Sequence, residues 1–504
     1  MSKFFITTTL PYVNAEPHIG FAAEIIKADV IARWRRLLED EVFFNTGTDE
    51  HGQKIYEKAK EEGVAPLTYC DEYAAEFRSL KELLNLSVTN FIRTTDENHI
   101  LAAQEFWKRC AANGDIYKKN YKIKYCVGCE LEKTDSELVN CRCPLHPNKD
   151  LEEINEENYF FRFSKYQQPL LDLYKNNPNF VMPGERLNEI KAFVERGLED
   201  FSISRLAAKM PWGIPVPGDD SQVMYVWFDA LVNYISCLGW PNVTHPVSPG
   251  SSPPSREGNL FEEFWPGVQV CGKDNLRQQT AMWQAMLMSA GLPNSKQVLV
   301  FGFITANGQK MSKSIGNVIS PVELIDIYGV DATRYFLLKE IKPFTDSDFS
   351  LEKMDKLYTA DLANGLGNLA ARVSTLLEKN KIETSLKDPD DMTVNPNDAV
   401  VQEGDTGFAK MYLDFGLKMK DYAFDEALGV LWRKIAECDL VITEKQPWKM
   451  EDKAEIKKVL EPIAQEILNV AYLLAPFMPE TAEKLVKQFS QPQIKKSESL
   501  FPRM

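Results

Sequence analysis

The segment from Pro11 to Phe21 reads PYVNAEPHIGF and follows an apolar run that is expected to form a strand. This order predicts that His18 and Gly20 lie at the N-terminus of the first helix. Unpaired N–H groups and the helix dipole make such a position a site for anions, and glycine lets a flat ring or a phosphate approach the backbone closely. A protonated or hydrogen-bond-donating histidine there could stabilise charge on a transferring phosphoryl group. Taken alone, a histidine beside a proline in a turn is more often structural.

A second polar segment, Gly308 to Gly316, reads GQKMSKSIG and follows the expected strand Val298 to Phe303. Lys310 and Lys313 are point charges that could neutralise a polyphosphate from this loop. By itself, the same composition is typical of a solvated loop. The two segments together, in this order along one chain, favour a phosphate-handling site.

This pair of segments resembles the two signatures of the class I aminoacyl-tRNA synthetases. In that family the two loops flank ATP in a Rossmann-like domain, the carboxylate of an amino acid attacks the α-phosphate, and the aminoacyl group passes to the terminal ribose of tRNA. The resemblance assigns catalysis to His18, Gly20, Lys310 and Lys313, and implies Mg²⁺ with ATP. It implies charge stabilisation and positioning without a side-chain nucleophile. The family's first signature usually ends in histidine, whereas Phe21 cannot donate a hydrogen bond, so we expect catalysis to depend more on His18, Lys313 and the helix N-terminus.

Three further segments resemble the methionyl-tRNA synthetases: LPY at 10–12, GTDEHG at 47–52 and YVWFDA at 225–230. By this resemblance, Asp49 receives the α-ammonium group of methionine. A carboxylate suits an ammonium group, and aromatic neighbours suit a polarisable thioether. On pattern alone, the aromatic run at 225–228 is a buried strand. The methionine-binding residues implied by the resemblance are Leu10, Tyr12, Asp49, Trp227, Ala230, Tyr234 and Gln279.

The segment GKDNLRQQ at 272–279 resembles another part of that family, in which Gly272 and Asp274 approach the ribose of ATP. The resemblance also assigns Ile304, with His18, Gly20 and Lys313, to ATP. Two positions depart from the family, which commonly has histidine where this chain has Gln279 and Phe301. Because position 279 normally lies beside the methionine side chain, we expect a pocket of different shape.

Four cysteines lie close together in the sequence, and their spacing predicts a metal site. Cys126-x2-Cys129 followed by Cys143-x2-His146 is typical of two knuckles that supply one zinc tetrahedron. Cys141 is the spare thiol, and permutations among Cys129, Cys141 and Cys143 stay open. Such a closed site leaves no coordination position for a substrate, so the Zn²⁺ is expected to be structural. The family carries a similar knuckle in an inserted domain near the acceptor end of tRNA.

Two local features could contact tRNA. A basic run just before the zinc segment, Lys118, Lys119, Lys122 and Lys124, fits either a tRNA contact or a solvated edge strand. In the C-terminal part, Asn368, Arg372 and Trp448 match the residues with which methionyl-tRNA synthetases read the CAU anticodon. Asparagine and arginine can read base edges, and tryptophan can stack on an unpaired base.

These segments are positioned by an α/β fold: a Rossmann-like, doubly wound parallel sheet with an inserted zinc-containing domain and a C-terminal α-helical bundle. A helix is expected over Phe21–Leu38. Strands are expected at Lys3–Leu10, Val42–Phe44, Val223–Phe228, Val268–Cys271 and Val298–Phe303. Bundle helices are expected at Gly365–Leu377, Asp405–Tyr422, Asp425–Thr443, Ala454–Leu474 and Glu480–Phe489.

The predicted domains follow from this order. Residues 1–116 and 222–308 form the split catalytic domain, and 117–221 form the inserted domain with the zinc knuckle. Residues 309–356 carry the lysine loop and contact the tRNA stem, and 357–504 form the helical anticodon-binding domain.

The overall charge limits the kinds of partner. With 504 residues and a net charge of −15, the chain is not expected to bind nucleic acids or anionic membranes non-specifically, so tRNA would be met by local basic sites. No apolar run is long enough to span a membrane, and residues 1–13 make a poor signal peptide, which predicts a cytoplasmic protein. The chain ends soon after the last expected helix, which favours a monomer.

Three alternatives remain at this stage. Class I enzymes for valine, isoleucine or leucine need a large editing domain, for which the stretch between Gly20 and Lys310 is too short. Cysteine enzymes place zinc in the amino-acid pocket, unlike the predicted two-knuckle insert. A catalytically silent, zinc-containing tRNA-binding module is the third, and His18, Asp49, Lys310 and Lys313 argue against it.

Overall fold

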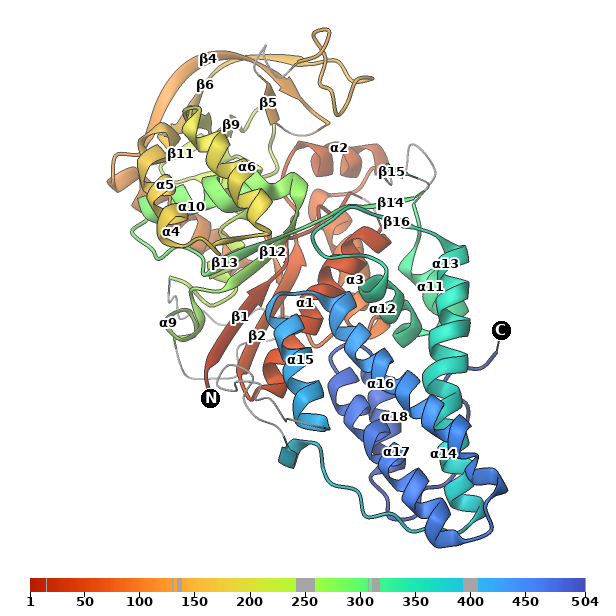
Figure 1. The fold of residues 1–504 in the computed structure, drawn as a ribbon. Coiled ribbons are helices and arrows are strands. Elements are labelled where there is room, and N and C mark those ends of the chain that lie inside the picture. The colour runs from red at the N-terminus through yellow and green to blue at the C-terminus, as the bar shows by residue number, and fades with distance from the viewer. Residues whose placement is uncertain are drawn as a thin grey trace.

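A computed structural model describes residues 1–14, 16–128, 131–133, 138–241, 259–306, 308–310, 318–392 and 407–503. Its centre is a parallel six-stranded sheet of order β3-β2-β1-β12-β13-β7 (Figure 1). The apolar runs Phe4–Ile6 and Val298–Phe301 are buried on both faces, as parallel strands require. The strands are β1 (Lys3–Thr7), β2 (Glu41–Thr48), β3 (Asn90–Arg93), β7 (Val181–Met182), β12 (Val268–Gly272) and β13 (Gln297–Phe301).

The strand order reverses between β1 and β12. After β1 the chain passes through α1 (Ile19–Leu37) to β2 on one side, and β12 is followed by β13 on the other. Crevices at the carboxyl ends of such neighbouring strands are the usual ligand sites of open α/β sheets. The predicted doubly wound sheet is therefore confirmed, and its switch point lies where both β1 and β12 end.

Helices cover both faces of the sheet. One core joins α1 to the sheet and to the C-terminal helices, and a second core lies on the opposite face around Phe106 and Trp283. The covering helices are α2 (Gln53–Glu62), α3 (Pro66–Leu83), α4 (Glu97–Ala112), α5 (Gln167–Asn176), α6 (Gly184–Glu195), α7 (Val226–Ala230), α8 (Asn233–Ser236), α9 (Leu260–Phe264) and α10 (Trp283–Ser289), the last preceded by the π-helix η4 (Gln278–Met282).

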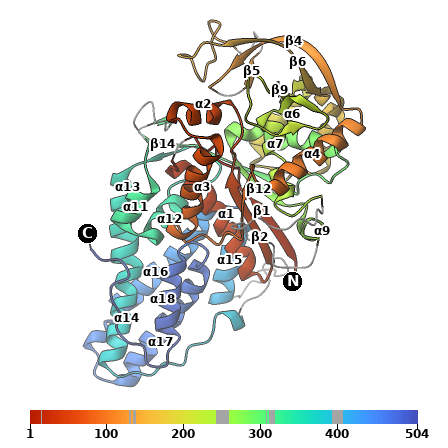
Figure 2. The same ribbon diagram turned by 180° about the vertical axis from the view of Figure 1, so that it is seen from behind.

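A long antiparallel pair extends from the sheet at one end of the molecule (Figures 1 and 2). It is formed by β4 (Ile116–Cys126) and β6 (Glu152–Phe161), flanked by β5 (Leu131–Lys133) and β8 (Phe201–Ser202). A small sheet of β9 (Ser204–Leu206), β10 (Pro215–Val216) and β11 (Asp219–Met224) leads back to α7.

The helical bundle lies at the opposite end (Figures 1 and 2). Before it, β14 (Ile304–Ala306) pairs with β15 (Gln309–Lys310) and β16 (Ser347–Phe349). The helices of this half are α11 (Pro321–Tyr328), α12 (Val330–Lys339), α13 (Leu351–Leu357), the π-helix η5 (Tyr358–Gly367), α14 (Asn368–Lys379), α15 (Phe408–Lys420), α16 (Phe424–Lys445), the short 3₁₀ turn η7 (Pro447–Lys449), α17 (Lys453–Leu474) and α18 (Pro479–Phe489).

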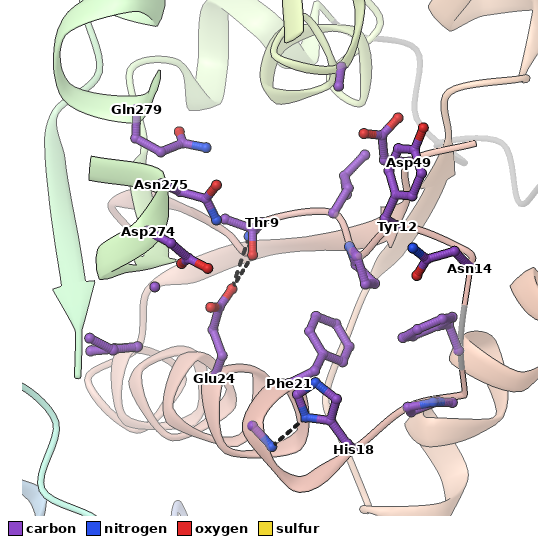
Figure 3. A pocket seen from close by; sticks show the side chains of 18 of the residues that line it. Thr9, Tyr12, Asn14, His18, Phe21, Glu24, Asp49, Asp274, Asn275 and Gln279 are labelled. Atoms are coloured by element: carbon purple, nitrogen blue, oxygen red, sulfur yellow. Dashed lines mark hydrogen bonds between the residues drawn. The ribbon is translucent and has the colours of Figure 1, made fainter. Parts of the chain in front are cut away.

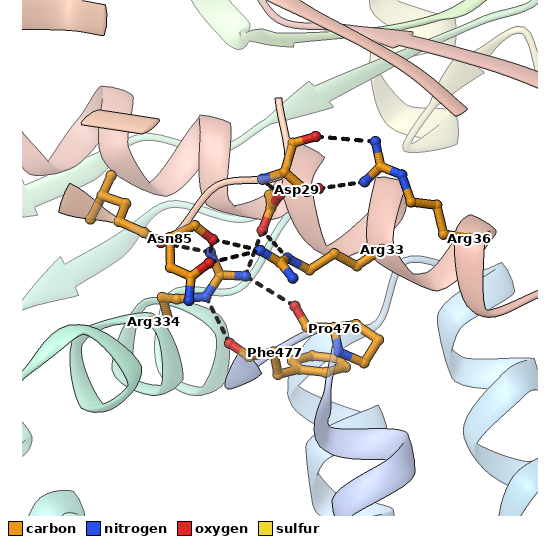
Figure 4. Close-up of polar contacts among 9 residues, drawn as sticks. Asp29, Arg33, Arg36, Asn85, Arg334, Pro476 and Phe477 are labelled. Atoms are coloured by element: carbon orange, nitrogen blue, oxygen red, sulfur yellow. Dashed lines mark hydrogen bonds and ion pairs between the residues drawn. The ribbon is translucent and has the colours of Figure 1, made fainter. Parts of the chain in front are cut away.

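A buried ionic cluster joins α1 to this half (Figure 4). Arg334 on α12 and Asp29 on α1 are both fully buried, and Arg334 Nη2 lies 2.7 Å from Asp29 Oδ2. The same guanidinium donates to the carbonyl oxygens of Leu84, Pro476 and Phe477. One side chain thus connects the helix that begins at the switch point with the loop between α17 and α18.

The structure confirms the helices expected in the bundle within a few residues where they are described, and places α1 where the first helix was expected. The strand predicted for Val223–Phe228 is wrong beyond Met224, because Trp227 and Phe228 lie in α7. The first strand ends at Thr7 rather than Leu10. Across the described part of the chain, no helix combines the length and apolar character needed to cross a membrane.

Candidate active site

A cavity of about 510 Å³ opens at the switch point between β1 and β12. Its wall brings together residues that lie far apart in the sequence, and Figure 3 shows them facing one another across the space. All predicted methionine-binding residues and most predicted ATP-binding residues line it: Leu10, Tyr12, His18, Gly20, Asp49, Trp227, Ala230, Tyr234, Gly272, Asp274, Gln279 and Ile304.

His18 is the N-cap residue of α1. Its Nδ1 accepts a hydrogen bond of 3.0 Å from the Gly20 N–H. An Nδ1 that accepts leaves the ring proton of a neutral histidine on Nε2, where it can be donated to a ligand. The expectation of unpaired N–H groups here needs correction, because the Ile19 N–H also donates, to the carbonyl oxygen of Ile319. The Gly20 and Ile19 amides are thus already used within the protein, and the ring of His18 lines the cavity.

Asp49 and Tyr12 form one wall of the cavity (Figure 3). The segments that follow β1 and β2 continue side by side, with the Asp49 N–H donating to the Pro11 carbonyl oxygen at 2.9 Å and Tyr12 paired with Asp49 in a parallel bridge. The Tyr12 hydroxyl donates to the carbonyl oxygen of His51 at 2.7 Å. A carboxylate and an aromatic ring are thereby fixed at the cavity.

The apolar part of the cavity is formed by α7, α8 and η4. Trp227 and Ala230 lie on α7, and Tyr234 lies on α8. Gln279, on η4, is buried and donates through Nε2 to the Tyr234 hydroxyl. The glutamine that replaces the family's histidine is therefore part of the wall, and its amide is oriented by a tyrosine.

Gly272 ends β12, and Asp274, two residues later, lies across the cavity from Asp49 (Figure 3). A Cβ at Gly272 would lie 2.7 Å from Oδ1 of Asp274, so glycine is required for this carboxylate to take its position. Lys273 points away and pairs with Asp346 at 2.5 Å. Asp274 itself lines the cavity.

The sequence reasoning missed Glu24, which also lines the cavity. It accepts hydrogen bonds from the Thr9 hydroxyl at 2.6 Å and the Thr9 N–H at 3.2 Å (Figure 3). Burial raises the pKa of its carboxyl to about 7, with Asp274 adding to the rise and Thr9 opposing it.

Lys27 was missed as well. It is 2% exposed, lines the cavity, and lies 5.1 Å from the centre of the Phe301 ring. Burial lowers the pKa of this ammonium group to about 8, while Glu24 opposes the shift. The signal was present in the sequence, since Gly20, Glu24 and Lys27 share one helix face and the two charges interrupt an apolar helix.

Of the two predicted catalytic lysines, Lys310 is described by its backbone and Lys313 is not described. The backbone of Lys310 lies in β15, opposite Thr305 of β14. Lys313 lies outside the described residues. The predicted pairing of this loop with His18 therefore stays a prediction.

The predicted zinc segment brings three potential ligands together at the end of β4. Sγ of Cys126 and Sγ of Cys143 lie 3.8 Å and 4.0 Å from Nδ1 of His146, and all three ligand atoms are within 4.8 Å of one another. Ligands of a tetrahedral zinc site are about 3.6 Å apart, as follows from the usual Zn–S and Zn–N bond lengths. Cys141 is exposed and outside this group, and Cys129 lies outside the described residues.

Gly128 explains how the histidine reaches this group. A Cβ at that position would lie 2.4 Å from the His146 ring, so only glycine lets the ring lie against the first knuckle. The donor set of thiols and an imidazole fits a zinc ion.

Of the predicted tRNA-contacting residues, Arg372 and Trp448 are brought together. The Arg372 guanidinium lies 5.5 Å from the centre of the Trp448 ring and pairs with Asp439 at 2.6 Å. Trp448 is 46% exposed, and Asn368 is exposed one turn before Arg372. The three side chains therefore lie at one end of α14, away from the cavity.

The basic run lies on β4, which pairs with β6. Lys118 pairs with Asp219 at 2.7 Å and with Glu157 at 3.9 Å. Lys119 lies over the Phe160 ring. Lys118 is thus paired within the protein, and a tRNA contact of the basic run stays a prediction.

Comparisons with a family, with two curated relatives and with a solved structure agree. The family described as “tRNA synthetases class I (M)” matches residues 4–152 and 128–374. A methionine–tRNA ligase of Brucella suis biovar 1 is 41% identical over 502 residues, covering 98% of this chain and 93% of that protein. A methionine–tRNA ligase of Thermosynechococcus vestitus is 41% identical over 493 residues, covering 96% and 89%. The structure of Mycobacterium tuberculosis methionyl-tRNA synthetase in complex with methionyl-adenylate is 34% identical, with a TM-score of 0.88 and 100% of both chains covered.

Proposed function

This chain belongs to the class I methionyl-tRNA synthetase family, and from that premise we propose how its cavity carries out the reaction of a methionine–tRNA ligase. Methionine and ATP first form methionyl-adenylate and pyrophosphate. A ribose hydroxyl of the 3′-terminal adenosine of tRNA(Met) then attacks the methionyl carbonyl carbon, the bond to the phosphate oxygen breaks, and AMP leaves.

We assign methionine to the side of the cavity formed by Asp49 and α7. The Asp49 carboxylate accepts hydrogen bonds from the α-ammonium group, because a buried carboxylate beside an ammonium forms a charge-assisted hydrogen bond. The thioether extends among Leu10, Tyr12, Trp227, Ala230, Tyr234 and Gln279, where aromatic rings favour contact with a polarisable sulfur.

We assign the nucleotide to the side formed by α1 and β12. Asp274 accepts from the ribose hydroxyls, and Gly272 and Gly20 let the nucleotide approach the backbone. Ile304 borders the base. His18 Nε2–H donates to the α-phosphate, where negative charge develops as the reaction proceeds.

In the first step, a carboxylate oxygen of methionine attacks the α-phosphorus, the bond to the bridging oxygen breaks, and pyrophosphate leaves with that electron pair. Lys310 and Lys313 would stabilise the charge that moves onto pyrophosphate. Mg²⁺ bound together with the nucleotide would supply further positive charge. The contribution of the protein is positioning and charge stabilisation, so a side-chain nucleophile is not required.

We propose that Cys126, Cys143 and His146, with Cys129, hold a structural Zn²⁺. The ion would hold the turn after β4 to the loop that carries Cys143, and its closed donor set leaves no position for a substrate.

We propose that the anticodon of tRNA(Met) meets the exposed end of α14. Trp448 offers a stacking face, and Asn368 and Arg372 offer groups that read base edges. Because protein synthesis takes place in the cytoplasm, we propose that the protein is located there. One chain supplies every residue assigned above, so a monomer suffices, which light scattering with the purified protein would test.

One observation carries the assignment: residues from the first signature segment, from the segment at 272–279 and from the methionine-like segments line a single cavity at the switch point. Calorimetric binding of methionine and of its deaminated analogue tests it. We expect the wild type to prefer methionine by at least tenfold and Asp49→Asn to lose that preference. Glu57→Gln, an exposed change on α2, is the control and should keep it. An Asp49→Asn protein with unchanged preference would overturn the assignment.

A further inference from the structure

A buried carboxylate beside the methionine site is held by two histidines. Asp229 lies on α7 between Trp227 and Ala230 and is fully buried. Its Oδ2 lies 2.7 Å from Nδ1 of His51, and its Oδ1 lies 2.9 Å from Nε2 of His99. His51 is 5% exposed and His99 is 0% exposed, so the cluster is closed to water.

Hydrogen-bond chemistry fixes the roles of both rings. An ionised carboxylate only accepts, so His51 carries its proton on Nδ1 and His99 on Nε2. Nδ1 of a neutral His99 then accepts from the Ser236 hydroxyl, which lies at 2.9 Å. Although burial alone raises the pKa of a carboxyl, the two imidazoles hold the pKa of Asp229 below its usual range.

The cluster connects elements that are separate in the sequence. His51 lies on the segment after β2, two residues beyond Asp49, and its carbonyl oxygen accepts from the Tyr12 hydroxyl at 2.7 Å. His99 lies on α4, and Asp229 lies on α7. A shift of Asp229 would therefore move Trp227 and Ala230 relative to Asp49 and Tyr12.

The connection is specific to one side of the cavity. The segments that the cluster bridges carry the residues assigned to methionine. The nucleotide side, with His18, Gly272 and Asp274, is held by other contacts, such as the bond between His18 and Gly20. A fully satisfied buried polar network fixes one geometry, whereas a partly satisfied one does not.

We propose that His51, Asp229 and His99 are positioning residues that set the distance between the ammonium-binding and thioether-binding parts of the methionine site. The proposal rests on the proposed assignment of methionine to this side of the cavity. The residues act through Tyr12, Asp49 and Trp227 and do not touch the substrate.

The structure supplies matched variants, because the two rings use different nitrogens. Asparagine carries its amide nitrogen as many bonds from Cβ as Nδ1 of histidine, and glutamine carries it as many bonds as Nε2. His51→Asn and His99→Gln therefore keep a donor toward Asp229. His51→Gln and His99→Asn contain the same chemical group but misplace it.

The test is steady-state pyrophosphate exchange by the full chain, with KM measured separately for methionine and for ATP. We expect His51→Asn and His99→Gln to stay within about threefold of the wild-type KM for methionine. His51→Gln and His99→Asn should raise that KM at least tenfold, since small misplacements in a site cost up to about a hundredfold. The KM for ATP should change less than threefold in all four.

The proposal fails if both members of a pair give the same KM for methionine, or if the KM for ATP rises together with the KM for methionine. It also fails if both members of a pair lose their fold alike. Each of these results indicates a purely structural role. A wild-type protein without methionine-dependent exchange would instead refute the proposed function, so the two failures are distinguishable.

Discussion

Replacing Arg334 by methionine tests whether the buried ionic cluster holds α1 against the C-terminal half. The guanidinium is fully buried and makes four hydrogen bonds of 2.7–3.0 Å, to Asp29 Oδ2 and to three backbone carbonyl oxygens. In Arg334→Met, the Asp29 carboxylate keeps its ion pair with Arg33, at 2.8 Å. The three carbonyl groups lose a donor in a place that water does not reach.

The expected loss is large. Breaking a buried ion pair by removing one partner costs about 3–5 kcal/mol, and the unpaired carbonyl groups add to it, although such costs are not additive. We therefore expect a loss of about 4 kcal/mol, which lowers the Tm of a protein of this size by roughly 4 °C. Differential scanning calorimetry of both proteins at pH 7 measures it.

The sign of the pH dependence follows from Asp29. Burial raises the pKa of its carboxyl, but Arg334 and Arg33 outweigh this and hold it below its usual range. In the wild type, this stabilisation is present above the carboxyl's ordinary pKa and is lost only as pH falls through the lower native value. In Arg334→Met the carboxyl takes up a proton more readily, so the difference in Tm between the two proteins should shrink as pH falls from 7 toward 5.

Two controls separate the cluster from ordinary surface charge. Lys342→Met removes an exposed lysine that lies 4.0 Å from Asp425, and such surface pairs contribute little, so Tm should not change measurably. Asp29→Asn added to Arg334→Met removes the uncompensated charge and should not lower Tm further. An Arg334→Met protein that melts within 1 °C of the wild type would have lost only about 1 kcal/mol of stability or less. That result would contradict a role of the cluster in holding α1 against the C-terminal half.

Three further predictions concern the metal, the cavity and the first signature. Cys143→Ser should lose the zinc that metal analysis finds in the wild type, whereas Cys141→Ser, outside the ligand group, should keep it; equal zinc contents would contradict the assignment. Lys27→Met should raise Tm at pH 7, because burial lowers the pKa of Lys27 to about 8 and the charged lysine therefore destabilises the folded wild type below that pH. As pH rises from 8 toward 10 this penalty disappears, so the gain in Tm should fade. A gain in Tm that grows with pH would contradict this. Phe21→His should stay active in pyrophosphate exchange and could be faster, since Phe21 packs edge-on against Phe77 at 5.5 Å and a histidine of similar shape adds a donor; abolished exchange would contradict this.

The sequence allowed the parallel sheet and the bundle to be predicted because their patterns are long and periodic. Helices such as α16 and α17 repeat apolar residues over several turns, and only their ends differ from the expected bounds. The run Tyr225–Phe228 gave the wrong element because a short apolar segment between turns fits a buried helix as well as a strand. There α7 follows β11 directly, so one continuous apolar stretch contains both.

The candidate site could be predicted where a short segment contains a recognisable motif, as with His18 and Asp49. Its supporting contacts could not, because they join residues far apart in the chain. The bond from His51 to Asp229 spans 178 positions, and the bond from His99 to Asp229 spans 130. The internal use of the Gly20 N–H by His18 also depends on backbone geometry that spacing alone does not reveal.

The central claim is that this cavity activates methionine with ATP. Pyrophosphate exchange measured with each of the twenty standard amino acids tests it most directly. We predict exchange with methionine at least a hundredfold above that with valine, isoleucine, leucine or cysteine, and loss of that exchange in Asp49→Asn. Exchange that is absent with methionine, or faster with another amino acid, would contradict it.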